Sequence, residues 1–204
     1  MTGSMRNRRG GRGMHRKDLQ DRQNSGRNGR KLPEYLTPAE IDQVLEAAIG
    51  PRQRLLILLM WRAGLRVSEA ISLRVGDVSL YDDPPTLKVR QGKGHKDRIV
   101  RLHGELRDAL DVHFQYGRPP QDSFVLDGVH RTTAHKWVRE MGARALPGRR
   151  VFPHIFRHSA ARHWLAEGVP INVVSKWLGH ATLGTTMVYL ELVPDPEGYM
   201  DRVR

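Results

Sequence analysis

The 204-residue sequence contains no cysteine, few aromatic residues and no long apolar segment. Without cysteine, the chain has no disulfide, no thiolate nucleophile and no cysteine-based zinc or iron–sulfur site, which fits a reducing compartment. Its longest apolar run, residues 55–61, is far shorter than the roughly 20 residues that a membrane-spanning helix needs, and no signal segment opens the chain. We therefore expect a soluble, cytoplasmic protein.

Acidic residues are in the minority: 22 Asp and Glu face 34 Lys and Arg, which gives a formal charge of +12. A charge of this size favours a polyanionic partner, and nucleic acid is the first candidate. The segment 1–31 holds ten of the basic residues but only four apolar ones, too few for it to fold alone. We predict a disordered basic arm over 1–31 and one folded domain over 32–204. The arm either contacts DNA phosphates or is a solvated linker, and its candidate contacts are Arg6, Arg8, Arg9 and Arg12.

The first predicted helix of the folded domain starts at Pro38. Thr37 can cap this helix, and Glu40 closes the capping box. The next apolar stretch is hydrophobic on nearly every side and ends at Gly64, which predicts a central core helix. Helical patterns are expected over residues 38–49, 51–63, 67–73, 104–116, 131–145, 153–167, 170–178 and 185–192.

Between residues 78 and 102 the pattern changes to β-branched segments separated by turn residues. Residues 86–90 and 98–102 predict two antiparallel strands around a glycine-containing loop, 91–97. The expected fold class is therefore mainly α with a small antiparallel β-sheet, an α+β domain.

Basic residues recur at the ends of these helices. Arg66 follows the core helix, and Glu69 lies three residues later on the same face, where it could hold the guanidinium. His154 and Arg157 share the same spacing at another helix start. Arg66 taken alone is most simply a structural ion-pair partner of Glu69.

The sequence resembles the tyrosine recombinase, or phage integrase, family. The matching stretches occur in the family's order and spacing and cover about residues 35–192; they are 63–70 (AGLRVSEA), 92–98 (GKGHKDR), 154–158 (HIFRH), 178–180 (LGH) and Tyr189. Five linked motifs carry the resemblance, since none would be enough alone. The resemblance implies the catalytic-domain fold of that family.

It also implies cleavage of one DNA strand by a tyrosine, which yields a 3′-phosphotyrosine and a free 5′-hydroxyl, with no metal or other cofactor. Two guanidinium groups suit the non-bridging oxygens of a phosphodiester, and a phenol with a pKa of about 10 must lose its proton as it attacks. The catalytic residues that the resemblance implies are Arg66, Lys93 (general acid), His154, Arg157, His180 and Tyr189 (nucleophile), and in it His154 and His180 bind the scissile phosphate and assist proton transfers. Supporting residues are Glu69 and His158, and Lys96 and Arg98 are expected to bind DNA.

Each of these residues has a simpler interpretation. Tyr189 lies among apolar residues and could be a packed core tyrosine, in which case Tyr199 is the alternative nucleophile. Lys93 lies in a turn with other basic residues that could equally contact phosphate. His154 and His158 are spaced as helical metal ligands, but His163 falls off their face and no HExxH pattern is present.

The sequence departs from the family because no helical core-binding domain precedes residue 32. The chain is then either a naturally minimal recombinase or an excised catalytic domain. Double-stranded DNA is the expected partner, with a homotetramer on two DNA sites and a monomer possible in solution. The competing functions are a type IB topoisomerase and a DNA-binding protein whose catalytic site is idle.

Overall fold

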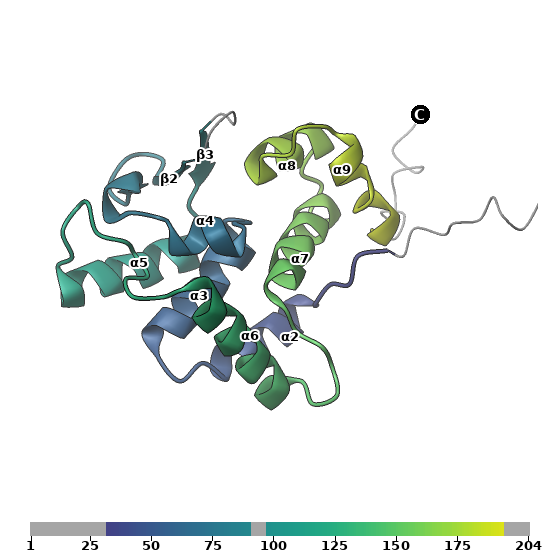
Figure 1. The fold of residues 1–204 in the computed structure, drawn as a ribbon. Coiled ribbons are helices and arrows are strands. Elements are labelled where there is room, and N and C mark those ends of the chain that lie inside the picture. Colours follow the sequence, from purple (N-terminus) through teal and green to yellow (C-terminus); the bar gives the residue numbers. More distant parts are fainter. Residues whose placement is uncertain (1–31, 91–96, 194–204) are drawn as a thin grey trace, which may run out of the picture. The chain divides into compact units, whose positions relative to one another are not determined.

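A computed structural model describes residues 32–90 and 97–193 of the chain. Its elements, shown in Figure 1, follow one another as α2 (Pro38–Glu46), α3 (Pro51–Arg62), α4 (Val67–Ile71), the 3₁₀ turn η1 (Val75–Asp77), β1 (Val78–Ser79), β2 (Thr86–Val89), β3 (Arg98–Arg101), α5 (Gly104–Gly117), α6 (Arg131–Ala145), α7 (Pro153–Ala166), α8 (Ile171–Leu178), α9 (Gly184–Met187) and the 3₁₀ turn η2 (Leu190–Leu192). The expected fold class, helices with a small antiparallel sheet, is confirmed. The arm expected over 1–31 lies outside the described residues.

The start of α2 is the one that the sequence predicts. The side chain of Thr37 accepts a hydrogen bond from the backbone N–H of Glu40, and the Glu40 carboxylate accepts one from the N–H of Thr37 at 2.7 Å. The helix ends at Glu46, earlier than predicted, because the chain must turn before α3. Gly50 is extended, as the proline at position 51 requires of the residue before it.

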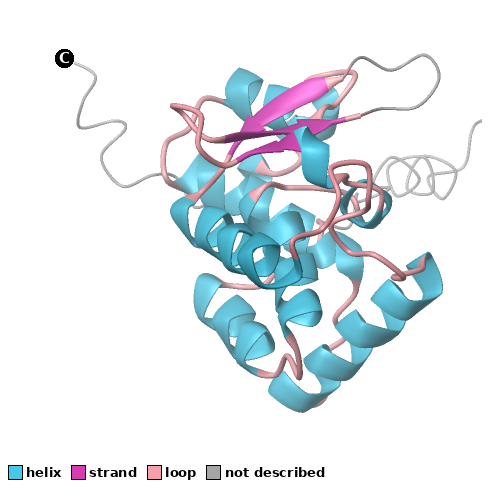
Figure 2. Ribbon diagram, turned by 90° about the vertical axis from the view of Figure 1, so that its left-hand side faces the viewer, coloured by secondary structure: helices cyan, strands magenta, loops and turns pink. Residues whose placement is uncertain are grey.

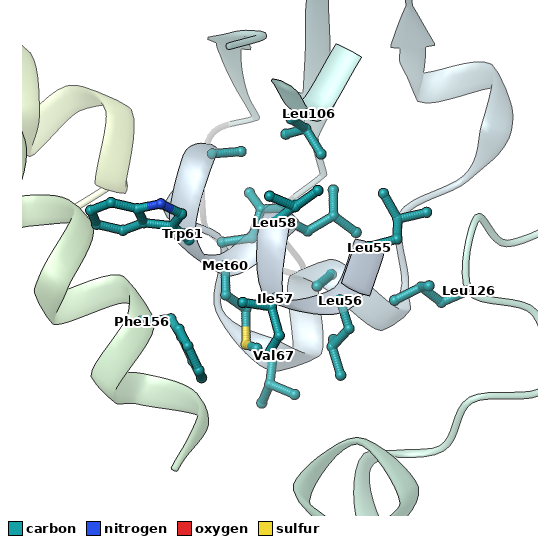
Figure 3. Packing of buried hydrophobic residues seen from close by; sticks show 14 of the residues in the cluster. Leu55, Leu56, Ile57, Leu58, Met60, Trp61, Val67, Leu106, Leu126 and Phe156 are labelled. Carbon is teal, nitrogen blue, oxygen red and sulfur yellow. The ribbon is translucent and has the colours of Figure 1, made fainter. Parts of the chain in front are cut away.

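Helix α3 is the centre of the core. Its residues from Leu55 to Trp61 are at most 2% exposed, and the helix packs against α4, α5, α6 and α7. Figure 3 shows Leu106 of α5 on one side of the helix and Phe156 of α7 on another. A helix that is apolar all round must be enclosed in this way, and its C-terminal end is therefore held rigidly within the core.

The sheet has three antiparallel strands in the order β1-β2-β3 (Figure 2). Leu87 of β2 pairs with Val78 of β1 on one side and with Val100 of β3 on the other. The two strands expected from the sequence are present. The third, β1, was not predicted, because two residues are too short to show a strand pattern.

The helix expected over 185–192 is wrong in its extent. Helix α9 ends at Met187, a turn follows, and Tyr189 lies in that turn immediately before η2. Thr185, Thr186 and Val188 are β-branched and hold a short helix poorly. The segment is instead held by its packing, since Tyr189 belongs to a buried cluster with Ala161, Leu165, Val174 and Leu178.

None of the helices within the described ranges is long and apolar enough to cross a membrane.

We predict that Gly64→Ala lowers the free energy of unfolding by about 2–5 kcal/mol, the combined cost of a left-handed backbone and of overpacking. Gly64 has φ +63°, and a Cβ atom there would lie 2.8 Å from the Trp164 ring and 3.0 Å from the Leu178 side chain. Urea denaturation measures the loss. Gly128→Ala is the matched control, because Gly128 has φ +71° with open space around it, so only the backbone cost remains. Equal losses in the two variants would contradict the role of the close contact.

Candidate active site

The site is built around the carboxylate of Glu69. Glu69 is the third residue of α4, and it accepts hydrogen bonds from the backbone N–H and from Nη1 of Arg66, the residue that caps this helix, both at 2.8 Å. Arg98 donates to both carboxylate oxygens, at 3.0 and 2.7 Å. Nη1 of Arg157 lies 3.7 Å from the carboxylate. Three guanidinium groups therefore share one carboxylate, and the cluster keeps an excess of positive charge.

Glu69 is ionised under all ordinary conditions. Burial alone would raise its pKa, but the hydrogen bonds and charge of Arg98, the N–H of Arg66 and the charge of Arg157 outweigh this and lower the pKa to about 2. The carboxylate is thus a permanent negative charge that holds cations which would otherwise repel one another.

Arg157 is fixed by two helix ends. Its side chain is 4% exposed, and its guanidinium donates to the carbonyl oxygens of Gly64 and Leu178, both at 2.5 Å. These carbonyls follow α3 and end α8, where no helical N–H is available to them. Burial and the neighbouring Arg66 lower the pKa of Arg157 to about 9, so the group is still a cation at pH 7.

Arg66 differs from Arg157 in being open to solvent, since 37% of its side chain is exposed. The ion pair with Glu69 that the sequence suggested is present, yet it engages one terminal nitrogen of Arg66. The position after the rigid end of α3 holds the base of the side chain still. Arg66 can therefore keep its contact with Glu69 and also donate to an anion arriving from solvent.

Arg98 lies in a different place from the one the sequence suggested. We expected it on a DNA-binding surface, but its side chain is 7% exposed. Its Nε donates to the carbonyl of Trp177 at 2.8 Å, while its terminal nitrogens bind Glu69. Because β3 packs against α8, this guanidinium is enclosed. Its hydrogen bonds connect β3 to α8 through Trp177 and to α4 through Glu69. Lys93 and Lys96 lie outside the described residues, on the segment between β2 and β3.

Three histidines accompany the arginines. His154 is exposed in the first turn of α7, His158 lies one turn later with its ring centre 6.2 Å away, and His180 follows the C-terminal glycine of α8. Burial and then the charge of Arg157 lower the pKa of His180 to about 4. Burial, His154 and Arg157 lower that of His158 to about 4. Burial and Arg157 also lower the pKa of His154. These rings are therefore neutral at pH 7.

Tyr189 is brought into contact with these rings. It is 4% exposed, and its hydroxyl lies 2.7 Å from Nδ1 of His158, at hydrogen-bonding distance. Its ring stacks at 20° on His180, with 6.4 Å between the ring centres. Burial raises the pKa of Tyr189, and the charges of Arg157 and Arg66 act against that increase. The described residues thus bring together five of the six catalytic candidates that the resemblance implies.

Thr186 is a site residue that sequence reasoning missed. It is completely buried, and its hydroxyl is 2.7 Å from Nδ1 of His180. This contact fixes the orientation of the His180 ring through Nδ1, and Nε2 is the ring nitrogen that does not contact Thr186. The only signal in the sequence is a hydroxyl residue three positions before Tyr189 in an apolar segment.

A basic groove lies beside the site. It is lined by α6 and by the segment that leads into α7, and its residues include Arg131, His135, Lys136, Arg139, Arg149 and Arg150. The charges of His135 and Arg131 contribute to the lowered pKa of His154, so the groove and the site share one positive field. Sequence reasoning did not single out these residues, because they are separated along the chain and match no motif.

Within residues 32–90 and 97–193, no three His, Asp or Glu side chains are grouped so that they could hold a metal ion. His163, which shares the helix of His154 and His158, packs on the ring of Trp61 with 5.1 Å between ring centres.

The fold and this site together are those of a tyrosine recombinase catalytic domain. Residues 34–194 match the phage integrase family, and the chain belongs to that family. A tyrosine recombinase of Pseudothermotoga lettingae is 39% identical over 168 residues, which are 80% of this chain and 58% of that protein. XerA of Thermococcus kodakarensis is 36% identical over 173 residues, 80% of this chain and 60% of that protein.

Solved structures agree with this assignment. A crystal structure of XerA recombinase superimposes with a TM-score of 0.73 at 30% identity and covers 85% of this chain and 67% of that one. The catalytic domain of bacteriophage HP1 integrase has the same fold, with a TM-score of 0.63 at 24% identity over 84% of this chain and 92% of that one. The chain spans about three fifths of the length of the relatives that it matches in sequence.

We predict that Glu69→Gln lowers the free energy of unfolding by roughly 3 kcal/mol at pH 7, since one pKa unit corresponds to about 1.4 kcal/mol. The folded-state pKa of Glu69 is depressed from 4.5 to about 2, so its stabilisation is complete above pH 4.5 and is lost as the pH falls toward 2. Guanidinium denaturation of both proteins at several pH values tests this. The difference between them should be constant above about pH 5 and should shrink below it.

Glu105→Gln is the control for this prediction. Glu105 also binds two arginines, Arg54 and Arg62, but its side chain is 29% exposed and that of Arg54 is 46% exposed. We expect a loss of less than about 1 kcal/mol there. A loss at Glu69 no larger than that at Glu105 would contradict the central role of the buried carboxylate.

Proposed function

We propose that this protein is a site-specific DNA recombinase that cleaves and rejoins DNA strands through a 3′-phosphotyrosine at Tyr189. The observation that carries the proposal is the position of one tyrosine hydroxyl beside two imidazole rings and within the field of Arg66 and Arg157. This set provides a nucleophile, proton acceptors and an anion site in one place. The relatives named tyrosine recombinases support the same conclusion.

In the proposed reaction, Arg66 and Arg157 bind the non-bridging oxygens of the scissile phosphate. The oxygen of Tyr189 attacks phosphorus, the bond from phosphorus to the 5′-oxygen breaks, and the phenol loses its proton. The negative charge on the non-bridging oxygens increases in the transition state, where two fixed cations stabilise it most. The 5′-oxygen receives a proton from Lys93, the general acid that the family resemblance implies. Rejoining is the same sequence in reverse, with a 5′-hydroxyl as the attacking group.

The proposed substrate is double-stranded DNA, and the basic groove of α6 is its proposed continuation beyond the scissile phosphate. Solved structures of XerH recombinase contain its difH substrate, which supports DNA as the ligand of this fold. We further propose that the protein acts as a homotetramer on two DNA sites, in the cytoplasm where its substrate lies. Integration, excision, inversion and resolution all use this chemistry.

We predict that Tyr189→Phe abolishes covalent attachment to DNA while leaving DNA binding within about threefold. The purified protein is incubated with fragmented DNA from its own replicon and quenched in detergent, and protein-linked fragments are isolated and sequenced at their ends. Adducts that require Tyr189 and begin at one sequence are the expected result. Phenylalanine keeps the ring and removes the nucleophilic oxygen, so folding and binding are preserved.

Other outcomes of this experiment separate the competing functions. Adducts that require Tyr189 but are scattered over many sequences indicate a type IB topoisomerase. Binding without any adduct in the wild-type chain indicates a DNA-binding protein with an idle site and contradicts the proposal.

We also predict that the double change Lys136→Gln and Arg139→Gln weakens binding to a short labelled duplex. It should reduce the slope of log affinity against log salt by about 2, since each lost phosphate contact removes about 0.9 from the slope. Both residues are exposed in the groove. Arg107→Gln on α5 is the control, because its guanidinium is paired with Asp108 outside the groove. Equal slopes for the two variants would contradict DNA binding along α6.

A further inference from the structure

The hydroxyl of Tyr189 has a specific partner that is not one of the implied catalytic residues. The resemblance assigns proton transfer to Lys93, His154 and His180. In the structure, however, the group that touches the Tyr189 oxygen is Nδ1 of His158, at 2.7 Å, and the two ring centres are 5.6 Å apart. His158 is the one hydrogen-bond partner of this hydroxyl within the described residues.

Helix α7 holds the Tyr189 segment at two points. His154, His158 and Arg162 are spaced four residues apart and lie along one face of the helix. Nε of Arg162 donates to the carbonyl of Leu192 at 3.0 Å, and its guanidinium packs over the ring of Tyr35. Arg162 thus contacts only the backbone of the segment, whereas His158 contacts the atom that would react.

The proposed chemistry requires a proton acceptor at this oxygen. A phenol attacks phosphorus only as it loses its proton, and burial makes this phenol a weaker acid than usual by raising its pKa. His180 stacks on the Tyr189 ring, but its Nδ1 is engaged by the hydroxyl of Thr186. For neutral His158 to accept the phenol proton through Nδ1, its own proton must be on Nε2.

Binding of a phosphate would make His158 a better acceptor. The groups that face it are His154 and Arg157 on its own helix, His180 after α8, and Tyr189. Arg157 is among the causes that lower the pKa of His158, and an anion held by Arg66 and Arg157 would offset that charge. The tyrosine oxygen also becomes more acidic as its bond to phosphorus forms. Transfer is therefore favoured during the attack and disfavoured before it.

We infer that His158 is a catalytic residue that accepts the hydroxyl proton of Tyr189 during strand cleavage and returns it during rejoining. In cleavage the bond from the tyrosine oxygen to phosphorus forms, the bond to the 5′-oxygen breaks, and the proton passes from the tyrosine oxygen to Nδ1 of His158. In rejoining, the 5′-hydroxyl attacks the phosphotyrosine and the departing tyrosine oxygen takes that proton back. This inference rests on the proposed function.

The first test needs no DNA. In ¹⁵N-labelled protein, the His158 ring should carry its proton on Nε2, and the Nδ1 resonance should shift when Tyr189→Phe removes the donor. A proton on Nδ1 in the wild-type protein, or an Nδ1 resonance that does not respond to Tyr189→Phe, overturns the inference.

The second test measures adduct formation in a single turnover, on the DNA fragment recovered by covalent trapping. Sulfur replaces the bridging 5′-oxygen at the scissile phosphate, so the leaving group needs no general acid and the rate reports on the nucleophile. His158→Ala removes both the contact and the base. His158→Asn places an amide oxygen near the position that Nδ1 occupies in the wild type. This oxygen can accept the hydrogen bond but not the proton. Arg162→Ala loosens the segment and leaves the contact at the tyrosine oxygen in place.

We expect both His158 variants to form the adduct about 10²–10⁴-fold more slowly than the wild type at neutral pH, the usual range for loss of a general base. Their rates should rise with hydroxide concentration, and added imidazole should accelerate His158→Ala. Arg162→Ala should slow the reaction by the same factor at every pH, without a response to imidazole. An adduct-formation rate for His158→Asn within threefold of the wild type overturns the inference. So does a fold reduction in the rate of the His158 variants that is equal at pH 6 and pH 9.

Failure of the proposed function gives a different result. In that case the wild-type protein forms no adduct, or Tyr189→Phe still forms one, whatever residue occupies position 158.

Discussion

The shared carboxylate of Glu69 is the interaction on which the rest of this structure depends. A single negative charge, 10% exposed, is bound by Arg66 and Arg98 and lies within 4 Å of Arg157. These side chains come from α4 and the residue that caps it, from β3 and from α7, so one ion-pair cluster joins three parts of the chain. Removing one partner from such a buried cluster is strongly destabilising, because the remaining charges lose their compensation.

The same cluster leaves the site short of negative charge. Burial and then its cations lower the pKa of His154 and His180, and the charges of Arg157 and Arg66 act against the increase that burial causes in the pKa of Tyr189. A bound phosphate would supply the missing anion and relax each of these effects at once. Substrate binding and the readiness of the proton acceptors are in this way one electrostatic event, which couples chemistry to the presence of DNA in the proposed function.

Rigid surroundings make this electrostatic arrangement possible. Arg157 is directed by the carbonyls of Gly64 and Leu178, and His180 is directed by Thr186. Each contact depends on a helix that stops at the correct residue, and Gly64 and Gly179 both adopt the left-handed conformation that ends a helix. The Tyr189 segment is held less by its own helix propensity than by burial against α7 and α8.

The sequence by itself determined the positions of the helices up to residue 178, the β2–β3 pair and the motif residues of the family, because periodicity, caps and glycine stops are local properties of the chain. Only the tertiary structure decided that Arg98 is enclosed with Glu69, 29 residues away, and that His158 meets Tyr189, 31 residues away. It also decided the break before Tyr189, the role of Thr186 and the groove along α6. These features arise from contacts between distant segments, and packing, not local spacing, sets which side chain of a motif reaches which atom.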